Sequence, residues 1–255
     1  MKRNVSRVAL AAVIVLAAVP VIVGSQAPGS PDDLSRLPLT EMRAAPDTSG
    51  VLVIFLTGDG GWASIDKQVT AEIRGHGVDV VGLNTRPYLG KKKTPAEIAF
   101  DLTRIARHYM TAWNKSRLAI VGYSRGADLM PFGVTGMPAD LRGKTVLLAF
   151  LGLATRAGFE FHFADIMFEV KRDSDRPTLP VLVQLKGMKM LCIYGSEEEH
   201  SACREVPPGL ITRLVQLPGG HHYDVDYKRV GDLVLEEIRG GGGAPAATSR
   251  LPAQH

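Results

Sequence analysis

Cysteine is scarce in this chain, which excludes some protein classes. Cys192 and Cys203 are the only two cysteines among 255 residues, too few for a disulfide-dense secreted scaffold. No pair of histidines lies close to them in the sequence, so we expect no zinc or other metal site. In an oxidising compartment the two cysteines would form one disulfide across an acidic loop, and two free thiols are the alternative.

Nucleotide-binding motifs are also missing. The glycine-rich stretch TGDGGW at 57–62 contains neither G-x-x-x-x-G-K-[ST] nor G-x-G-x-x-G. A phosphate-binding loop is therefore the weaker interpretation of this stretch. We expect no cofactor.

A strong basic excess is missing as well. The formal net charge is +4, of which Lys2, Arg3 and Arg7 contribute three charges, and no acidic residue precedes Asp32. The remainder of the chain is therefore close to neutral. Net charge gives no support to nucleic-acid binding, and we expect no nucleic acid as a partner.

The N-terminal segment has the pattern of an export signal. A basic stretch at 1–7 precedes an apolar run at 8–24, and the letters SQA at 25–27 form a small-x-small cleavage site. Pro20 interrupts the run, which is also slightly short for a spanning helix. We expect cleavage after Ala27, with retention as an N-terminal anchor as the alternative. Either way we expect an exported protein, which in a bacterium lies in the periplasm or on the outer face of the membrane.

The bulk composition is that of one ordinary globular domain. The chain is 45% hydrophobic and 22% charged, without a visible internal repeat. Residues 28–48 are rich in Pro, Ser and Asp and indicate a linker with an edge strand around 37–42. From 240 to 255 the chain is rich in Gly, Ala and Pro, which predicts disorder. The folded domain is therefore expected at 49–239.

Apolar runs alternate with helical segments along this domain. The run VLVIFL at 51–56 is continuous, which is typical of a strand buried on both faces of a parallel sheet. Alternation at this spacing predicts an α/β fold with a mostly parallel central sheet and helices on both faces. Further strands are predicted at 78–83, 117–121, 145–153, 191–194 and 211–217, helices at 65–74, 94–113 and 227–238, and a loop at 84–93.

The stretch IVGYSRGAD at 120–128 contains the pattern G-x-S-x-G. Where a strand turns sharply into a helix, small residues on both sides of the serine let the backbone pass without a clash. Ser124 would then lie above the sheet edge, at the positive end of the following helix. An ordinary Gly/Ser turn also fits the five letters alone, but the apolar run before them and the helix formers after them favour a nucleophile elbow.

Gly58, Asp59 and Gly60 follow the strand at 51–56 and form a candidate oxyanion loop. In an α/β-hydrolase this loop supplies one half of the oxyanion hole, and the amide after the nucleophile supplies the other. The second amide belongs here to Arg125.

A candidate acid follows the serine in the order that this fold requires. The acid commonly stands three residues after a glycine in the turn that ends its strand. This spacing selects Glu198, three residues after Gly195, and leaves Glu197 and Glu199 open.

A candidate histidine follows the last predicted strand. The loop GGHHY at 219–223 holds two adjacent histidines, and the frame G-H-x-[FY] favours His221 over His222. The imidazole would take the proton of Ser124 as the hydroxyl attacks an acyl carbonyl, and Glu198 would fix its tautomer and stabilise its cation.

These motifs together resemble the bacterial virulence protein family of VirJ and the C-terminal domain of AcvB. The resemblance implies an exported, serine-dependent enzyme that hydrolyses the aminoacyl ester of lysyl-phosphatidylglycerol. Arg125 stands where a phenylalanine or similar residue is usual, and LGKKK at 89–93 replaces an aromatic stretch. The matching stretches are TGDGGW (57–62), TPAEIAFDLTRIARHY (94–109), GYSRGADLMPF (122–132), CIYGSEEEHSAC (192–203) and GGHHYDVDY (219–227).

A cationic lysyl head would favour acidic groups near the serine. Asp59 lies in the oxyanion loop, and Asp128 lies one helical turn after Ser124. We expect Asp59, Trp62 and Asp128 to contact substrate, and a purely structural role for the two aspartates is the alternative. The lysines at 91–93 could contact anionic lipid heads, although a solvated charge run is the preferred interpretation.

The expected partners are an aminoacylated phospholipid and a membrane surface, met peripherally, and family members are associated with secretion-system components. Two other function classes stay open: a generic periplasmic carboxylesterase, and a non-catalytic binding protein that uses the fold as a scaffold. Activity on short p-nitrophenyl esters without activity on aminoacylated lipid would favour the first. An intact Ser/Glu/His set weighs against the second.

Overall fold

The computed structural model describes residues 33–162 and 172–240. The chain divides into a unit at 1–30 and a unit at 31–255, and everything described here belongs to the second. The predicted export signal and nearly all of the predicted tail lie outside the described residues. Within the described ranges, no helix is both long enough and apolar enough to cross a membrane.

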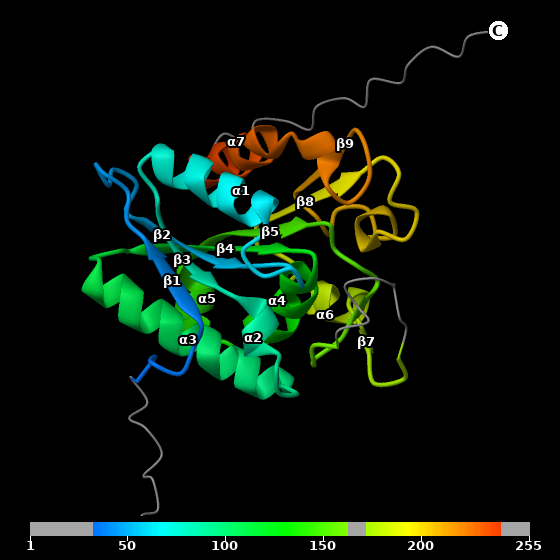
Figure 1. Cartoon of the computed structure of the whole chain (residues 1–255), viewed down its shortest axis with the longest axis horizontal. Helices are drawn as coiled ribbons and strands as arrows, with labels where there is room; N and C mark the ends of the chain where they lie inside the picture. Colours follow the sequence, from blue (N-terminus) through cyan, green and yellow to red (C-terminus); the bar gives the residue numbers. More distant parts are fainter. Residues whose placement is uncertain (1–32, 163–171, 241–255) are drawn as a thin grey trace, which may run out of the picture. The chain divides into compact units, whose positions relative to one another are not determined.

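Seven strands of the described residues form one sheet (Figure 1). Their spatial order is β1-β3-β2-β4-β5-β8-β9; β1 is antiparallel to β3, and every other neighbouring pair is parallel. The mostly parallel sheet is therefore confirmed, and so is the edge strand before it. The strands are β1 (Leu39–Met42), β2 (Val51–Leu56), β3 (Asp79–Leu83), β4 (Arg117–Tyr123), β5 (Thr145–Leu151), β8 (Met190–Gly195) and β9 (Arg213–Leu217).

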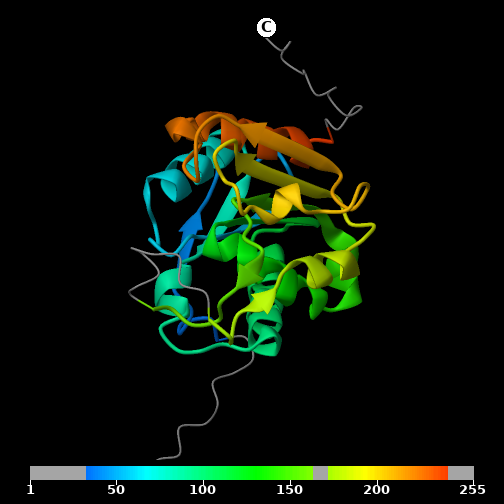
Figure 2. The same cartoon turned by 90° about the vertical axis from the view of Figure 1, so that its right-hand side faces the viewer.

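Helices cover both faces of this sheet (Figures 1 and 2). On one face α1 (Ser64–Gly75) packs against α7 (Tyr227–Ile238), and on the other α3 (Pro95–Ala112) packs against α4 (Arg125–Thr135). Two hydrophobic cores, one on each face, are the result. The predicted arrangement is confirmed.

The central strand β2 shows why its sequence is a continuous apolar run. All six of its side chains are buried. Successive side chains of a strand point to opposite faces, so the odd-numbered ones enter the core under α1 and α7 and the even-numbered ones enter the core under α3 and α4. Each large apolar side chain buried in this way contributes about 1.5–3 kcal/mol.

Helix α3 begins where the sequence predicts. Thr94 Oγ1 accepts the backbone N–H of Glu97, and Glu97 Oε2 accepts that of Thr94. Pro95 occupies the first helical position, where its missing N–H costs no intrahelical hydrogen bond. This reciprocal cap fixes the start of the helix.

Several short elements are not predicted by the sequence. They are too short to show a helical or strand period, and α2, for example, lies inside the predicted loop at 84–93. They are α2 (Thr85–Tyr88), α5 (Ala139–Lys144), α6 (Leu179–Gln184), the two-stranded antiparallel sheet of β6 (Arg156–Ala157) and β7 (Arg176–Pro177), and the 3-10 turns η2 (Ala202–Arg204) and η3 (Tyr223–Val225).

A buried ionic cluster attaches the edge segment to the domain. Lys115 Nζ and Asp79 are both fully buried and lie 2.8 Å apart, and Lys115 also pairs with Asp47. Asp79 in turn pairs with Arg43 Nε at 3.0 Å and accepts the backbone N–H of Ala44. The chain that follows β1 is therefore held to the beginning of β3 by ion pairs as well as by the sheet.

Candidate active site

The loops at the carboxyl ends of five parallel strands meet at one edge of the sheet. The register pairs Leu56 with Gly122, Tyr123 with Leu151 and Gly195 with Leu217, so these strand ends are level. Figure 2 faces this side of the molecule. The loops that follow β2, β4, β5, β8 and β9 carry Asp59, Ser124, Gly152, Glu198 and His221, respectively.

Ser124 occupies the strained turn predicted for a nucleophile. Its φ is 50° and its ψ is −120°, an unusual conformation for a residue with a side chain. A Cβ atom at Gly122 would lie 2.5 Å from the carbonyl oxygen of Gly126, and one at Gly126 would lie 2.2 Å from that of Leu56. Both glycines are therefore required by close backbone packing, and the elbow geometry is confirmed.

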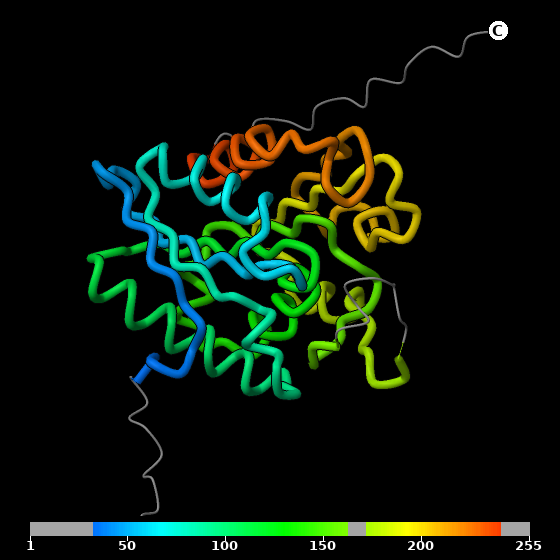
Figure 3. Tube along the Cα trace, viewed as in Figure 1, coloured from blue at the N-terminus to red at the C-terminus, as the bar shows by residue number. Residues whose placement is uncertain are grey.

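Glu198 is the glutamate that pairs with a histidine. Its Oε1 lies 2.5 Å from His221 Nδ1, and its Oε2 accepts the backbone N–H of Gly195 at 2.5 Å. Glu197 and Glu199 are exposed, and in the part of the chain that the structure describes neither pairs with a histidine. Figure 3 shows the two loops that bring this pair together, after β8 and after β9, side by side.

His222 points to a different partner. Its Nδ1 lies 3.2 Å from the hydroxyl of Tyr123. Burial and the neighbouring charge of His221 lower the pKa of His222, and the charge of Glu198 opposes this shift only in part. The structure thus separates the two adjacent histidines: only His221 meets the candidate acid.

The imidazole of His221 lies in a field of negative charge. Burial lowers its pKa, but the hydrogen bond and charge of Glu198, followed by the charges of Asp128 and Asp59, raise it above the ordinary value. A raised pKa makes the imidazole a stronger base. Tyr123 stacks on the ring at a centroid distance of 5.2 Å.

Gly152, directly after β5, makes room for this imidazole. Its φ is +66°, and a Cβ atom there would lie 2.6 Å from His221 Cε1. The carbonyl of the preceding residue, Leu151, accepts the backbone N–H of Ser124 at 2.8 Å. Ser124 and His221 therefore flank the same two residues at the end of β5.

No hydrogen bond joins Ser124 Oγ to the imidazole among the described residues. Catalytic hydrogen bonds of this kind are often long in free enzymes and shorten in the Michaelis complex. The Cβ atom of Ser124 would lie 3.4 Å from a Cβ atom at Gly58, so the serine also adjoins the loop after β2. The candidate nucleophile, the candidate base and the candidate oxyanion loop thus share one location.

The backbone N–H groups of the loop after β2 differ in whether they already have a hydrogen-bond acceptor. The N–H of Gly58 donates to Asp66 Oδ1 at 3.2 Å, so Gly58 leaves space beside the serine but does not direct its amide to a substrate. The N–H groups of Asp59 and Gly60 donate no hydrogen bond within the described residues. The candidate oxyanion donors are therefore Asp59 and Gly60, together with Arg125 in the predicted position after Ser124.

Asp66 is a structural residue of this site that the sequence reasoning missed. Besides Gly58 it accepts the N–H of Ala63 at 3.1 Å, and so fixes both ends of the loop. Burial raises the pKa of Asp66 to about 6, and these hydrogen bonds lower it only in part. Its place at the third position of a helix that follows a glycine-rich loop is a capping pattern that points to such a role. Gly152 was missed too, although it ends an apolar run.

The two predicted substrate-binding aspartates lie close to the serine but differ in their surroundings. Asp59 forms an ion pair with Arg125, whose Nε lies 3.1 and 3.3 Å from its two carboxylate oxygens. Asp128 is buried and accepts the N–H of Ala154 at 2.8 Å. Burial raises its pKa to about 7, against the opposing charge of Arg125.

Trp62 packs on the sheet. Its ring stacks on Phe55 at 6.3 Å and covers Gly82, where a Cβ atom would lie 2.2 Å from the indole. These contacts are structural, and a contact of Trp62 with substrate stays a prediction.

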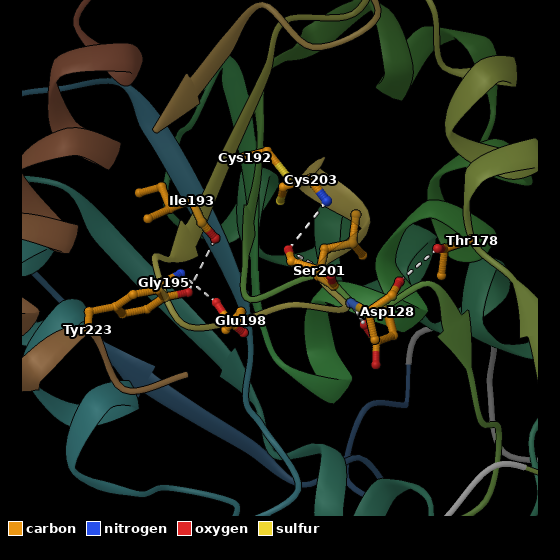
Figure 4. The surroundings of a disulfide bond; sticks show 11 residues. Asp128, Thr178, Cys192, Ile193, Gly195, Glu198, Ser201, Cys203 and Tyr223 are labelled. Carbon is orange, nitrogen blue, oxygen red and sulfur yellow. Dashed lines mark hydrogen bonds between the residues drawn. A yellow bond between two sulfur atoms is a disulfide. The ribbon is translucent and has the colours of Figure 1, made fainter. Parts of the chain in front are cut away.

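Cys192 and Cys203 form the expected disulfide. It links β8 to the turn η2 and closes the loop that carries Glu198 (Figure 4). Ser201, inside this loop, donates its hydroxyl to the carbonyl of Leu153 and accepts the N–H of Cys203. The acid loop is thus fixed to β8 by a covalent bond and to the end of β5 by hydrogen bonds.

A metal centre is not part of this arrangement. No group of three or more His, Cys, Asp or Glu side chains in the described ranges could hold a metal ion. The arrangement of serine, imidazole, carboxylate and backbone amides is that of an acyl-transfer site.

Comparisons with known proteins agree with the fold. A family model described as "Bacterial virulence protein (VirJ)" matches residues 50–241. No curated protein matches the chain.

Solved structures resemble the chain at low sequence identity. MenH from S. aureus is 13% identical with a TM-score of 0.58, and the match covers 80% of this chain and 99% of that one. Est1E from Butyrivibrio proteoclasticus is 12% identical with a TM-score of 0.53, covering 79% and 94%. XC6422 from Xanthomonas campestris, described as an a/b serine hydrolase without lid, is 15% identical with a TM-score of 0.53, covering 82% and 90%. At these identities the likeness shows the α/β-hydrolase fold.

Proposed function

Because the chain belongs to the bacterial virulence protein (VirJ) family, we propose that it is an exported serine hydrolase that cleaves the aminoacyl ester of lysyl-phosphatidylglycerol. The observation that carries the hydrolase proposal is the Glu198–His221 pair at 2.5 Å, beside a serine in a nucleophile elbow. The esterase and serine-hydrolase neighbours support ester hydrolysis in general. The lysyl ester is the finer step, and it rests on the family resemblance and on the charge of the site.

Each of these residues has a role in one step of the proposed ester hydrolysis. Ser124 Oγ attacks the ester carbonyl carbon while His221 Nε2 takes its proton, and Glu198 holds the proton on Nδ1 and stabilises the imidazolium. The backbone N–H of Arg125 and one from the loop after β2 stabilise the oxyanion. The tetrahedral intermediate expels the alcohol, which takes the proton from His221. Water then hydrolyses the acyl-enzyme with the same base.

The acidic surroundings support a cationic acyl group. Three carboxylates, those of Glu198, Asp128 and Asp59, raise the pKa of His221, and one guanidinium, that of Arg125, lies among them. Near neutral pH, Asp128 is only partly ionised because burial raises its pKa to about 7. A lysyl ammonium beside it would favour the ionised form. Asp59 and Asp128 are therefore proposed to bind the lysyl group.

These two aspartates can be tested by changing charge without changing shape. If Asp59→Asn and Asp128→Asn both leave KM for the lysyl ester unchanged, the lysyl-binding role is wrong. A rise in KM for the lysyl ester but not for an uncharged acyl ester would support it.

The location and partners are proposals as well. The disulfide and the family fit an exported protein, and we propose the periplasm, with peripheral contact to the membrane that holds the substrate. Association with secretion-system components remains a further proposal.

The deciding experiment is release of free lysine from lysyl-phosphatidylglycerol vesicles by the purified protein and by its Ser124→Ala variant. Lysine release that disappears in Ser124→Ala supports both reaction and nucleophile. His222→Gln is the matched control, because it removes the neighbouring imidazole that does not meet Glu198, and it should retain activity. Hydrolysis of short p-nitrophenyl esters without lysine release would assign the protein as a carboxylesterase, and activity on neither would point to a binding role.

A further inference from the structure

A cavity of about 270 Å³ lies between the segment that precedes α3 and the two-stranded β6–β7 sheet. The backbone N–H of Lys93 donates to the carbonyl of Phe159 at 2.8 Å, which fixes the two walls to each other. Figure 2 shows the loop before α3 and the β6–β7 sheet on the side of the molecule where the parallel strands end. Among the residues that the structure describes, the charged side chains that line the cavity, apart from His162, are Lys92, Lys93, Arg176, Glu160 and Asp175.

Two cations of this cavity are not neutralised locally. Lys92 and Arg176 are exposed, and no carboxylate of the described residues lies within ion-pair distance of either. The guanidinium of Arg176 lies 5.6 Å above the ring of Phe159. Lys93, by contrast, is occupied, because its ammonium lies 3.7 Å from Asp101 and 4.5 Å from the ring centre of Tyr88.

Two acidic side chains, Asp175 and Glu160, also line the cavity. One carboxylate oxygen of Asp175 accepts the backbone N–H of Arg172 at 2.9 Å, which stabilises its charge from inside the wall. Glu160 remains as the second acid. Because Asp101 pairs with Lys93, two basic and two acidic side chains of the described lining remain, and the two basic ones, Lys92 and Arg176, have no carboxylate as a direct partner.

Arg125 connects the cavity to the nucleophile. It directly follows Ser124, and a Cβ atom at Gly158, which lines the cavity, would lie 2.7 Å from Arg125 Nη1. The Nε of the same guanidinium pairs with Asp59 in the loop after β2. The arginine side chain therefore adjoins both the residue that lines the cavity and the loop after β2.

We propose that this cavity is the leaving-group subsite and that it binds an anionic phosphodiester carried by the alcohol half of the ester. Lys92 and Arg176 contact the phosphate oxygens, and Phe159 forms the apolar wall beneath them. The inference rests on the proposed ester hydrolysis. In this arrangement the two halves of the substrate bind to side chains of opposite charge. The cationic acyl group lies beside Asp59 and Asp128, and the anionic alcohol lies in the cavity beyond Arg125.

The test measures binding, so it requires no turnover. The Ser124→Ala protein is titrated calorimetrically with glycerophosphoglycerol, the soluble phosphodiester headgroup, and with inorganic phosphate. Adding Lys92→Glu or Arg176→Glu removes one cation and introduces repulsion, and each should weaken binding about tenfold, as expected for the loss of a charge-assisted contact of about 1.4 kcal/mol. Lys186→Glu changes an exposed lysine in the turn after α6, outside the cavity lining; it is the matched control and should bind like the parent.

The outcomes separate this inference from the proposed function. Binding that depends on Lys92 and Arg176 supports the subsite even if no lysine is released from vesicles. Absence of headgroup binding, or equal binding by all three charge variants, overturns it even if lysine is released. Binding of inorganic phosphate as tight as that of the headgroup would show a simple anion site and would also overturn it.

A vesicle experiment distinguishes the subsite from general attraction to a membrane. The protein is mixed with vesicles of phosphatidylglycerol, and binding is compared between Lys91→Glu and Lys92→Glu; Lys91 is exposed but does not line the cavity. Greater loss in Lys92→Glu supports the subsite. Equal losses, with no binding of the soluble headgroup, would assign both lysines to the membrane surface and contradict it.

Discussion

Removal of the disulfide should destabilise the domain without abolishing the site. Cys192 and Cys203 are separated by 11 residues, and both are fully buried. In the chain-entropy model, a crosslink that closes a loop of this length stabilises the folded state by about 3 kcal/mol at 25 °C, because it restricts the unfolded chain. The double variant Cys192→Ala/Cys203→Ala should lose approximately this free energy of unfolding.

The same variant should keep its acid in place while it is folded. The N–H of Ala202 donates to the carbonyl of Leu153 at 2.9 Å, and Arg204 donates to the carbonyls of Glu198 and Ser196 at 2.8 and 2.6 Å. These hydrogen bonds hold the acid loop independently of the sulfur atoms. We therefore expect the folded variant to retain ester hydrolysis at 25 °C, within about a factor of three of the parent, a change in activation free energy below about 0.7 kcal/mol.

Urea unfolding monitored by fluorescence, beside ester hydrolysis in the absence of urea, measures both effects. With a slope of about 3 kcal/mol per M, appropriate to a domain of this size, the midpoint should fall by about 1 M. The parent protein in excess reductant is the control and should unfold like the variant. An unchanged midpoint would refute the entropic account, and a folded but inactive variant would refute the claim that hydrogen bonds alone hold Glu198.

The remaining predictions concern the base, its space and the buried ion pair. Glu198→Gln removes the charge that raises the pKa of His221. Because the neutral imidazole is the base, the acidic limb of the rate–pH profile should then move to lower pH. The value of kcat should fall by about 10³–10⁴-fold. An unmoved limb would mean that another group titrates. Gly152→Ala places a Cβ 2.6 Å from the imidazole at a φ of +66°, so kcat/KM should fall at least about tenfold while the far-UV circular dichroism is kept; full activity would contradict this contact. Lys115→Met leaves the buried Asp79 with Arg43 as its remaining cationic partner, and should cost up to about 3 kcal/mol in urea unfolding. Asp79→Asn in the same background should recover part of the loss, and no recovery would count against an ionic origin.

Local patterns in the sequence were sufficient for the architecture. The apolar run at 51–56 predicts a strand buried on both faces, and Thr94, Pro95 and Glu97 predict the start of α3, because strand alternation and helix capping depend on residues a few positions apart. The glycines around Ser124 predict the elbow for the same reason. Short elements such as α2 escaped prediction because four residues show no period.

The choice among neighbouring candidates required the tertiary structure. The sequence order places Glu197, Glu198 and Glu199 in one loop, but which carboxylate meets an imidazole depends on how the loops after β8 and β9 approach each other. Likewise, Gly58 was expected to donate to an oxyanion, and its N–H is instead occupied by Asp66.

The sequence alone therefore determined the α/β architecture, the elbow at Ser124 and the order of serine, acid and histidine, since each follows from local sterics or from position along the chain. Only the tertiary structure decided that Glu198 pairs with His221 while His222 meets Tyr123. Such contacts join residues up to 99 positions apart. Their distances are set by the packing of the whole sheet, which no local pattern encodes.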